Sequence, residues 1–534
     1  MMFSNPVLRG CYPDPSVTRV GSDYFLVTSS FEYLPGLPIF RSADLVNWVQ
    51  VGAAIAGEGQ VDLSTVPSSG GLYAATLRHH DGTFYITNTV VHGEGRKGNF
   101  IVTATDIAGP WSDPVWLDDA AGIDPSLFFD ADGRAWFHAT RLAEPGEWPE
   151  QTEVWLRGLD LTTLQLVGPE YILWTGALIG AVWAEGPHLY RVGEYYYLLA
   201  AEGGTEHNHA VSIARSESVT GPYVGNPGNP VLTHRTLGRE YPVVGVGHAD
   251  LVQTPSGEWW SVLLGSRPYG GYFPNLGRET HLVPVTWEDG WPVFAPGTGR
   301  VEASFAAPNH PLAPPFDAAT DASGFAATNL PDTGVLRDDF DGETLAPTWN
   351  GVRAQPTAVS SLTARPGWLR LPLVPATLAE VAVPAFVGRR QQHQNARFSA
   401  HIDFAPGSGS EGAGLAVRQS EDAHLTLLIT AGDSGERRVV ATSRVRGLDT
   451  VIGDGVIPAG PLTLTVRAAG QDYHLEYETS SGIFPVAVAD ASELSSPRAG
   501  GFLGLWWGLY ATSHGAATSA HADIDWTEYV GADG

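Results

Sequence analysis

Three acidic residues stand in similar short motifs within the first 190 residues. Asp14 lies in Tyr-Pro-Asp-Pro-Ser (12–16), Asp124 in Ile-Asp-Pro-Ser-Leu (123–127) and Glu185 in Ala-Glu-Gly-Pro-His (184–188). These apolar or proline-bearing settings favour burial, and neighbouring buried carboxylates raise one another's pKa. Cleavage of a glycosidic bond uses two carboxyl groups: a protonated one gives its proton to the leaving oxygen, and an ionised one acts on water or on the anomeric carbon. A third carboxylate nearby can keep the acid protonated through charge repulsion. For any one motif alone, the alternative is a plain turn.

A repeated hairpin signal sets the spacing of these acids. Turn glycines followed by aromatic or apolar runs recur every 51 to 64 residues, at Gly21, Gly82, Gly133, Gly193 and Gly257. Such turns predict hairpins, and five repeats of this length predict a propeller of five blades. The spacing between hairpins in a β-sandwich can vary in the same way, so a sandwich is the alternative. Seven to nine residues before the glycines stand Asp14, Tyr73, Asp124, Glu185 and His248. If these positions begin the innermost strands, their side chains converge at one mouth of the propeller axis.

Composition limits the partners of the protein. The chain has 58 acidic against 30 basic residues and a net charge of -28, which argues against nucleic acid and anionic membranes as partners. A single cysteine, Cys11, allows no internal disulfide. The N-terminus has no signal-like run and no 18-residue apolar stretch occurs. We therefore expect a cytoplasmic protein, and its large β surface is compatible with a homo-oligomer.

The ordered motifs resemble glycoside hydrolase family 43, in particular its β-xylosidases and α-L-arabinofuranosidases with a C-terminal β-sandwich. Besides the three acidic motifs, Gly247-His248 and Leu-Gly-Arg-Glu-Thr (276–280) match that pattern. The resemblance covers most of the chain. It implies an all-β protein, a five-bladed β-propeller followed by a concanavalin-like (jelly-roll) β-sandwich. It also implies an inverting exo-hydrolase that releases β-D-xylose, α-L-arabinofuranose or both from short oligosaccharides.

The resemblance also implies roles for single residues. Asp14 would be the general base, Glu185 the general acid, and Asp124 the residue that raises the pKa of the acid and orients it. The substrate-binding residues would be Phe31, Tyr73, Thr205, His248 and Arg278. No cofactor is required, and no catalytic metal is expected; a structural calcium near His248 is allowed, although imidazole is a poor calcium ligand. Tyr73-Ala74-Ala75 departs from the family pattern, which usually has a proline there, so the local loop and the fine substrate preference are open.

The second half of the chain changes in texture. Residues 306–335 are rich in Pro, Ala, Asp and Thr and predict a linker between a propeller over 1–305 and a sandwich over 336–534. A sandwich loop is expected to help close the pocket, and the aromatic stretch from Phe502 to Tyr510 is a candidate. Edge-strand core packing is the alternative for Trp506 and Trp507.

Two other functions fit parts of this pattern. Retaining invertase-like hydrolases share the propeller, but their Asn-Asp-Pro-Asn and Glu-Cys motifs are absent from the chain. A non-catalytic glycan-binding protein could also combine a propeller with a lectin-like sandwich. Three mutually repelling carboxylates argue against it, because recognition of sugar hydroxyls does not need them.

Overall fold

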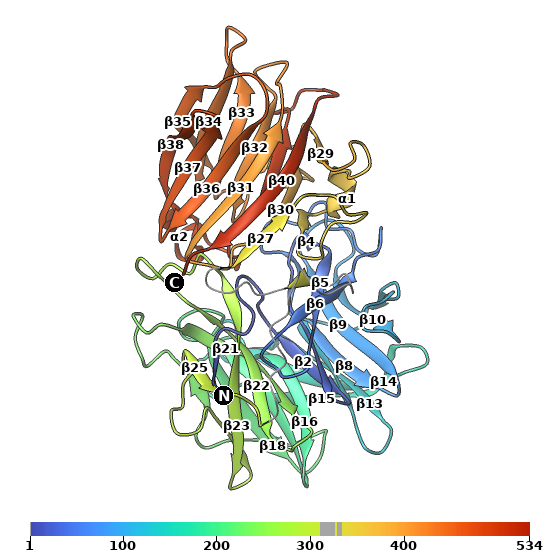
Figure 1. Cartoon of the computed structure of the whole chain (residues 1–534). Helices are drawn as coiled ribbons and strands as arrows, with labels where there is room; N and C mark the ends of the chain where they lie inside the picture. Colours follow the sequence, from blue (N-terminus) through green and yellow to red (C-terminus); the bar gives the residue numbers. More distant parts are fainter. Residues whose placement is uncertain (1, 310–325, 328–333, 534) are drawn as a thin grey trace.

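The computed structural model describes residues 2–309, 326–327 and 334–533. Within these residues almost all regular structure is β-strand, and the helices are single turns, α1 (Pro356–Val359), α2 (Ser496–Ala499) and a 3-10 turn at Ala491–Leu494. No helix in these ranges is long and apolar enough to cross a bilayer. The chain forms a propeller below and a sandwich above (Figure 1). Most of the predicted linker, 310–325 and 328–333, lies outside the described residues.

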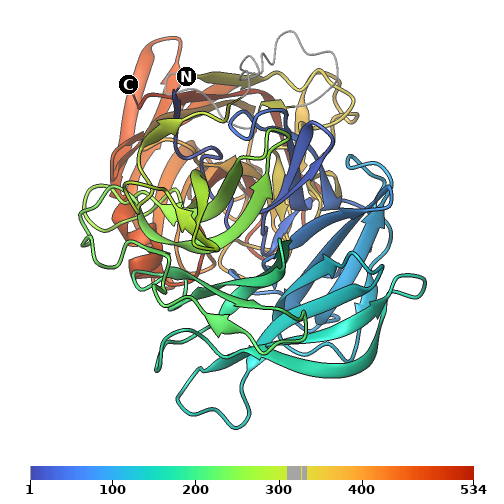
Figure 2. The same cartoon turned by 90° about the horizontal axis from the view of Figure 1, so that it is seen from below.

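Five antiparallel sheets form the propeller, and seen from below they follow one another around a ring, from blue to green (Figure 2). The first blade contains β2 (Ser16–Val20), β3 (Asp23–Val27), β5 (Gly36–Ser42) and β6 (Val49–Ile55). The second contains β7 (Gly71–Leu72) and β8 (Thr76–His80), which both pair with β9 (Thr83–Val91), followed by β10 (Gly98–Ala104) and β11 (Val115–Leu117). The third is β12 (Ile123–Phe129), β13 (Ala135–Leu142), β14 (Thr152–Asp160) and β15 (Gln165–Trp174).

The fourth and fifth blades complete the ring. The fourth blade contains β16 (Glu185–Val192), β17 (Tyr195–Glu202), β18 (Ala210–Ser216), β19 (Val224–Gly225) and β20 (Leu232–Thr233). The fifth contains β21 (Val244–Gln253), β22 (Trp259–Ser266), β23 (Arg278–Glu288) and β24 (Trp291–Phe294). Short pairings also join β1 (Met2–Ser4) to β25 (Ser304–Ala306) and β26 (Ala326–Ala327) to β6. The five-bladed propeller predicted from the glycine repeat is confirmed. All five turn glycines join the first and second strands of a blade, with φ between +61° and +90°.

The propeller core lies between the blades. Successive side chains of a strand point to opposite faces, so each blade can pack on both neighbours. Ile86 of β9 belongs to an apolar cluster that includes Val27 of the first blade, and the adjacent Tyr85 belongs to another that includes Phe137 of the third blade. Equivalent apolar clusters fill the remaining junctions, including the one between the fifth blade and the first.

The sandwich consists of two antiparallel sheets around one large apolar core. One sheet contains β27 (Val335–Asp338), β40 (His521–Gly531), β31 (Asn395–Asp403), β36 (Leu462–Ala469), β37 (Asp472–Thr479) and β38 (Gly482–Asp490), with β29 (Leu369–Pro372) beside β40. The other contains β35 (Leu448–Val456), β34 (Arg437–Val445), β33 (His424–Ala431), β32 (Gly412–Arg418), β39 (Trp506–Thr512), β30 (Ala385–Arg390), β28 (Asn350–Val352) and β4 (Tyr33–Leu34). The predicted sandwich is confirmed.

The two parts share a sheet, because β4 belongs to the chain of the first blade and pairs with β28 of the sandwich. Next to this pairing the rings of Tyr33 and Trp506 stack 3.9 Å apart. The fully buried Arg418 donates to Glu32 Oε1 at 3.0 Å and to the Tyr33 hydroxyl at 2.7 Å. The interface therefore fixes the loop that follows β3 and carries Phe31.

Candidate active site

A left-handed residue lies within the innermost strand of three blades and just before that of the first blade. Positive φ values occur at Asp14 (54°), Asp124 (55°), Gly186 (57°) and His248 (48°). Bulges interrupt three of these strands, between Ile123 and Ser126, between Glu185 and His188, and between Gly247 and Asp250. Left-handed residues other than glycine cost about 1–3 kcal/mol each and persist only where the surrounding structure holds them, often at functional sites. Bulges of this kind re-aim side chains, here toward the mouth of the axis.

These side chains line one cavity of about 1290 Å³, and Phe502 of the sandwich lines it too. All eight residues predicted as catalytic or substrate-binding line it: Asp14, Phe31, Tyr73, Asp124, Thr205, Glu185, His248 and Arg278. The sequence therefore identified a set of residues, far apart in the chain, that the fold brings together.

Asp14 is held as a carboxylate. Its Oδ1 accepts a hydrogen bond from Arg278 at 2.9 Å, and its Oδ2 accepts one from the Ser29 hydroxyl at 2.5 Å. His248 Nδ1 lies 3.7 Å from Oδ1. Burial alone would raise the pKa of Asp14, but Arg278, His248 and Ser29 outweigh it, and the pKa lies below its ordinary value. Asp14 is thus ionised at neutral pH and can accept a proton.

Glu185 is held as the protonated acid. Burial raises its pKa well above the ordinary value, and the negative charges of Asp124 and Asp14 raise it further against the pull of Arg278. Burial and repulsion from Asp14 likewise raise the pKa of Asp124 to about 6, although His248 and the Gly186 amide, which donates to Asp124 Oδ2 at 3.0 Å, oppose the shift. The cavity therefore combines an ionised carboxylate with a carboxyl that keeps its proton.

Gly186 allows His248 to lie directly beside the acid. A Cβ on Gly186 would come within 2.8 Å of the His248 ring, and the φ of +57° is one that glycine adopts without strain. The imidazole therefore supports the Glu185–Gly186 turn from the axis side.

Aromatic rings and one arginine form a further part of the cavity wall. The ring of Phe31 lies 5.8 Å from Tyr73 and 6.4 Å from Phe502, and the Arg278 guanidinium lies over Phe31 and Phe502 at 5.6 and 5.7 Å. Arg278 also donates to Thr205 Oγ1 at 3.0 Å. Flat apolar faces beside polar groups suit a sugar ring, which has one apolar side and several hydroxyls.

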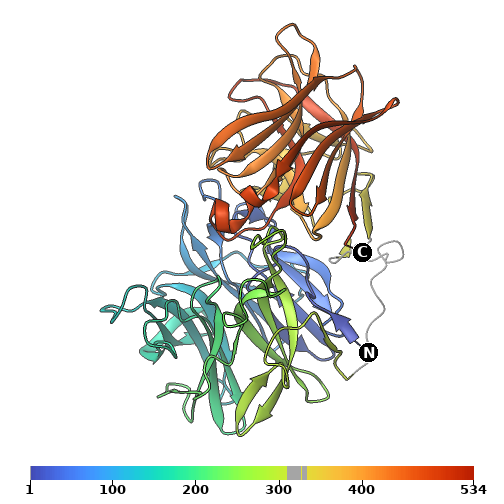
Figure 3. The ribbon, with the colours of Figure 1, turned by 90° about the vertical axis from the view of Figure 1, so that its left-hand side faces the viewer.

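Phe502 is the contribution of the sandwich to the cavity, and it lies in the predicted aromatic stretch. It follows α2, which lies at the end of the sandwich that faces the propeller (Figures 1 and 3). The amide of Phe502 donates to Ser69 Oγ at 2.9 Å. Core packing, the alternative for the two tryptophans, is confirmed for Trp507, but the edge position is wrong, because β39 is an inner strand between β32 and β30. Trp506 contacts the propeller through Tyr33.

Residues that sequence reasoning missed lie at the rim of the cavity and at the domain interface. Arg141, Glu153, His207 and Arg239 line the rim, but they belong to no repeated motif. Arg418 meets Glu32 across 386 residues of chain, and no local signal predicts such a contact.

The residues around His248 offer few of the oxygen ligands that a calcium ion needs. Ca²⁺ takes six to eight oxygen ligands. No group of three or more His, Cys, Asp or Glu side chains in the described part of the chain is arranged to hold a metal. Asp14 Oδ1 lies 3.7 Å from the ring, but it already accepts a hydrogen bond from Arg278, and Oδ2 accepts one from Ser29. These residues do not fit a calcium site, and no step below uses a metal.

Comparison with known proteins matches this geometry to a family. The model of glycosyl hydrolases family 43 matches residues 3–292, and that of the β-xylosidase C-terminal concanavalin A-like domain matches residues 337–530. The chain belongs to glycoside hydrolase family 43. It is 40% identical to a xylosidase/arabinosidase of Butyrivibrio fibrisolvens, over 98% of this chain and 99% of that relative.

Other family 43 proteins agree over nearly the whole chain. A non-reducing end α-L-arabinofuranosidase of Bacteroides ovatus is 39% identical over 99% of this chain and 94% of its own length. The solved structure of a xylan β-1,4-xylosidase of Bacillus halodurans superposes with a TM-score of 0.90 at 33% identity, covering 99% of this chain and 100% of that one. The protein is a glycosidase, which sets aside the non-catalytic glycan-binding alternative.

Proposed function

We propose that this family 43 enzyme releases single pentoses from the non-reducing ends of short xylo- or arabino-oligosaccharides, with inversion at the anomeric carbon. The observation that carries the proposal is electrostatic. One cavity holds Asp14 with a lowered pKa and Glu185 with a raised pKa. General acid–base hydrolysis of a glycoside needs these two protonation states at once.

In this mechanism Glu185 donates its proton to the glycosidic oxygen as the bond to the anomeric carbon breaks. Asp14 takes a proton from a water molecule, whose oxygen attacks the anomeric carbon from the opposite face. The sugar leaves with inverted configuration, the proton on Asp14 passes to solvent, and Glu185 is reprotonated from solvent. Asp124 keeps Glu185 protonated between turnovers because its charge disfavours a second negative charge nearby.

The remaining cavity residues bind the sugar. Arg278 and Thr205 offer polar groups, Phe31, Tyr73 and Phe502 offer ring faces, and His248 lies at the axis end. Phe502 of the sandwich closes over one side of the cavity, which supports attack at a chain end rather than along a polymer. The printed names of the relatives cover both xylosidase and arabinofuranosidase activity. We therefore include both pentoses in the proposed substrate class.

A substrate panel with one variant tests the proposal. Aryl β-D-xylosides, aryl α-L-arabinofuranosides, xylobiose and arabino-oligosaccharides are incubated with the protein, and the anomeric proton of the first product is followed by NMR. We expect release of single pentoses with inverted configuration. Glu185→Gln should abolish cleavage of xylobiose and spare more of the activity on aryl glycosides with good leaving groups, which need less protonation. Retained configuration would exclude the inverting mechanism, and full activity of Glu185→Gln would exclude Glu185 as the acid.

A further inference from the structure

A polar network lies on the propeller axis next to the catalytic residues, and none of the roles above uses it. It contains Ser16, Arg78, Ser126, His188, Tyr190 and Asp250. These residues come from β2, β8, β12, β16 and β21, the innermost strands of all five blades. We call this set the axis network.

Asp250 is the acceptor at the centre of the network. Its Oδ2 accepts hydrogen bonds from Ser16 Oγ at 2.7 Å, the Val17 amide at 2.9 Å and Arg78 at 2.9 Å. Its Oδ1 accepts from Arg78 at 3.2 Å and from the Tyr190 hydroxyl. The residue is completely buried, yet Arg78 outweighs the effect of burial and holds the pKa of Asp250 well below its ordinary value.

Arg78 extends the network to the remaining strands. Besides Asp250, it donates to Ser16 Oγ at 3.1 Å and approaches His188 Nδ1 to 3.0 Å. Because a guanidinium only donates, His188 Nδ1 must be an acceptor and the ring is neutral. Burial lowers the pKa of His188 to about 3, in agreement with that state. Ser126 Oγ lies 3.2 Å from the same nitrogen.

The network residues follow the active-site residues at short intervals. Ser16 comes two residues after Asp14, Ser126 two after Asp124, His188 three after Glu185 and Asp250 two after His248. In the last three strands the bulge lies between the two positions. Two or three strand residues span only about 7–10 Å, so a displaced anchor moves the active-site residue with it.

We propose that the Arg78–Asp250 pair is a positioning device for hydrolysis, which joins the five inner strands and so sets the separation of the Asp14, Asp124 and Glu185 carboxyl groups. A buried ion pair seldom stabilises a protein more than apolar residues of the same size would, so the role assigned to this pair is the geometry that it imposes on the strands. Hydrolysis with inversion depends on that geometry, since a misplacement of about 1 Å can cost about 100-fold in rate. The proposal rests on the proposed function.

Two variants and one matched control test this role. Arg78→Lys keeps the buried charge, but a single ammonium cannot reproduce the planar fork that reaches Ser16, Asp250 and His188 together. Tyr190→Phe removes the hydrogen bond that the phenol donates to Asp250 and the one that it accepts from the Leu251 amide at 2.9 Å, while the ion pair of Arg78 with Asp250 stays. Tyr196→Phe is the control, because the Tyr196 hydroxyl donates to Asp130 at 2.9 Å away from the cavity and the axis network. We measure kcat, KM and the melting temperature of each variant.

We expect Arg78→Lys to lower kcat about tenfold and Tyr190→Phe to lower it about threefold, each with KM within about twofold, because geometry and not sugar contact changes. Tyr196→Phe should leave kcat unchanged, although its melting temperature should fall by about as much as that of Tyr190→Phe. The proposal is overturned if Tyr190→Phe behaves like Tyr196→Phe, a comparison that decides the matter even if Arg78→Lys does not fold. Absence of pentosidase activity in the unaltered protein would instead refute the proposed function.

Discussion

Glu185 in the cavity and Asp250 in the axis network are buried acids on neighbouring inner strands, and their surroundings shift their pKa values in opposite directions. Asp250 accepts five hydrogen bonds, two of them from a guanidinium, and its pKa is lowered despite complete burial. Glu185 faces Asp124 and Asp14, and its pKa is raised. Asp250, whose charge is compensated, therefore stays ionised and joins the blades. Glu185, which faces two other carboxyl groups, keeps the proton that the reaction needs. Loss of a carboxylate should have different effects in the two regions.

The largest effect expected is on catalysis in the cavity. Asp14→Asn removes the proposed base and should lower kcat about 1000-fold, equivalent to about 4 kcal/mol of barrier, on every substrate regardless of leaving group. Thermal melting should show a folded protein. A variant with nearly normal kcat would mean that another group activates the water.

In the axis network the equivalent change should lower stability as well as kcat. Asp250→Asn leaves Arg78 buried without a counter-charge, which should cost about 3–5 kcal/mol and lower the urea midpoint of the propeller. Adding Arg78→Met to Asp250→Asn removes the second charge and should recover part of that loss. Equal midpoints for the single and the double variant would contradict the electrostatic account.

Asp124→Asn probes the repulsion between acids. Glu185 acts while protonated, so activity is present below its pKa and is lost as pH rises through it. Without the charge of Asp124 this pKa falls, and the alkaline limb of the kcat profile should move to lower pH. If the alkaline limb of the kcat profile does not move, repulsion from Asp124 is not what raises the pKa of Glu185.

The same variant should change stability in a pH-dependent way. The pKa of Asp124 is raised from 3.8 to about 6, so the stabilising effect of its proton is complete below about 3.8 and is lost as pH rises through about 6. Asp124→Asn should therefore melt above the unaltered protein at pH 7.5, and this advantage should shrink at pH 5.

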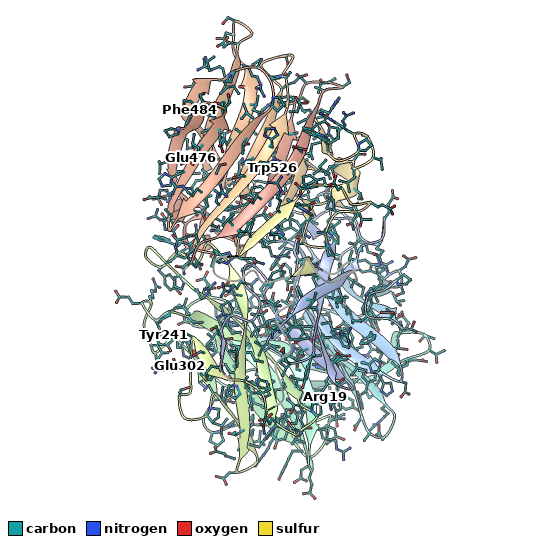
Figure 4. The ribbon with its side chains drawn as sticks, in the orientation of Figure 1. Arg19, Tyr241, Glu302, Glu476, Phe484 and Trp526 are labelled. Atoms are coloured by element: carbon teal, nitrogen blue, oxygen red, sulfur yellow. The ribbon has the colours of Figure 1, made fainter. Side chains whose placement is uncertain are left out.

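The smallest effect expected concerns the sandwich. Phe502→Ala opens the wall beside Phe31 and should raise KM about fivefold, the equivalent of about 1 kcal/mol. Trp526→Ala is the control, because Figure 4 places Trp526 on the sandwich sheet away from the cavity, where Arg337 lies 4.3 Å over its ring. Equal KM values for the two variants would mean that the sandwich does not take part in binding.

Local signals predicted the blades and the cavity residues well, because both repeat along the chain. Each turn glycine and the acid or aromatic before it recur at similar spacing, so Asp14, Asp124 and Glu185 could be placed on one axis from sequence alone. Arg78 and Asp250 could not be paired in this way, since 172 residues separate them and their side chains differ in type. Tyr33 stacks on Trp506 and forms β4, and no local signal predicts either contact. Contacts of this kind depend on how the two parts dock, which no local pattern encodes.

The pairing of β4 with β28 has a consequence for biosynthesis. Leu34 leaves the ribosome more than 300 residues before its partner Gly351, and Phe502 is made later still. Because chains fold from the N-terminus as they emerge, the five blades can close while β4 has no neighbour and the cavity lacks one wall. We therefore expect a nascent chain stalled after the propeller to hold the Asp14, Asp124 and Glu185 carboxyls but not the finished sugar site, and full activity to appear only after the last strands of the sandwich are released.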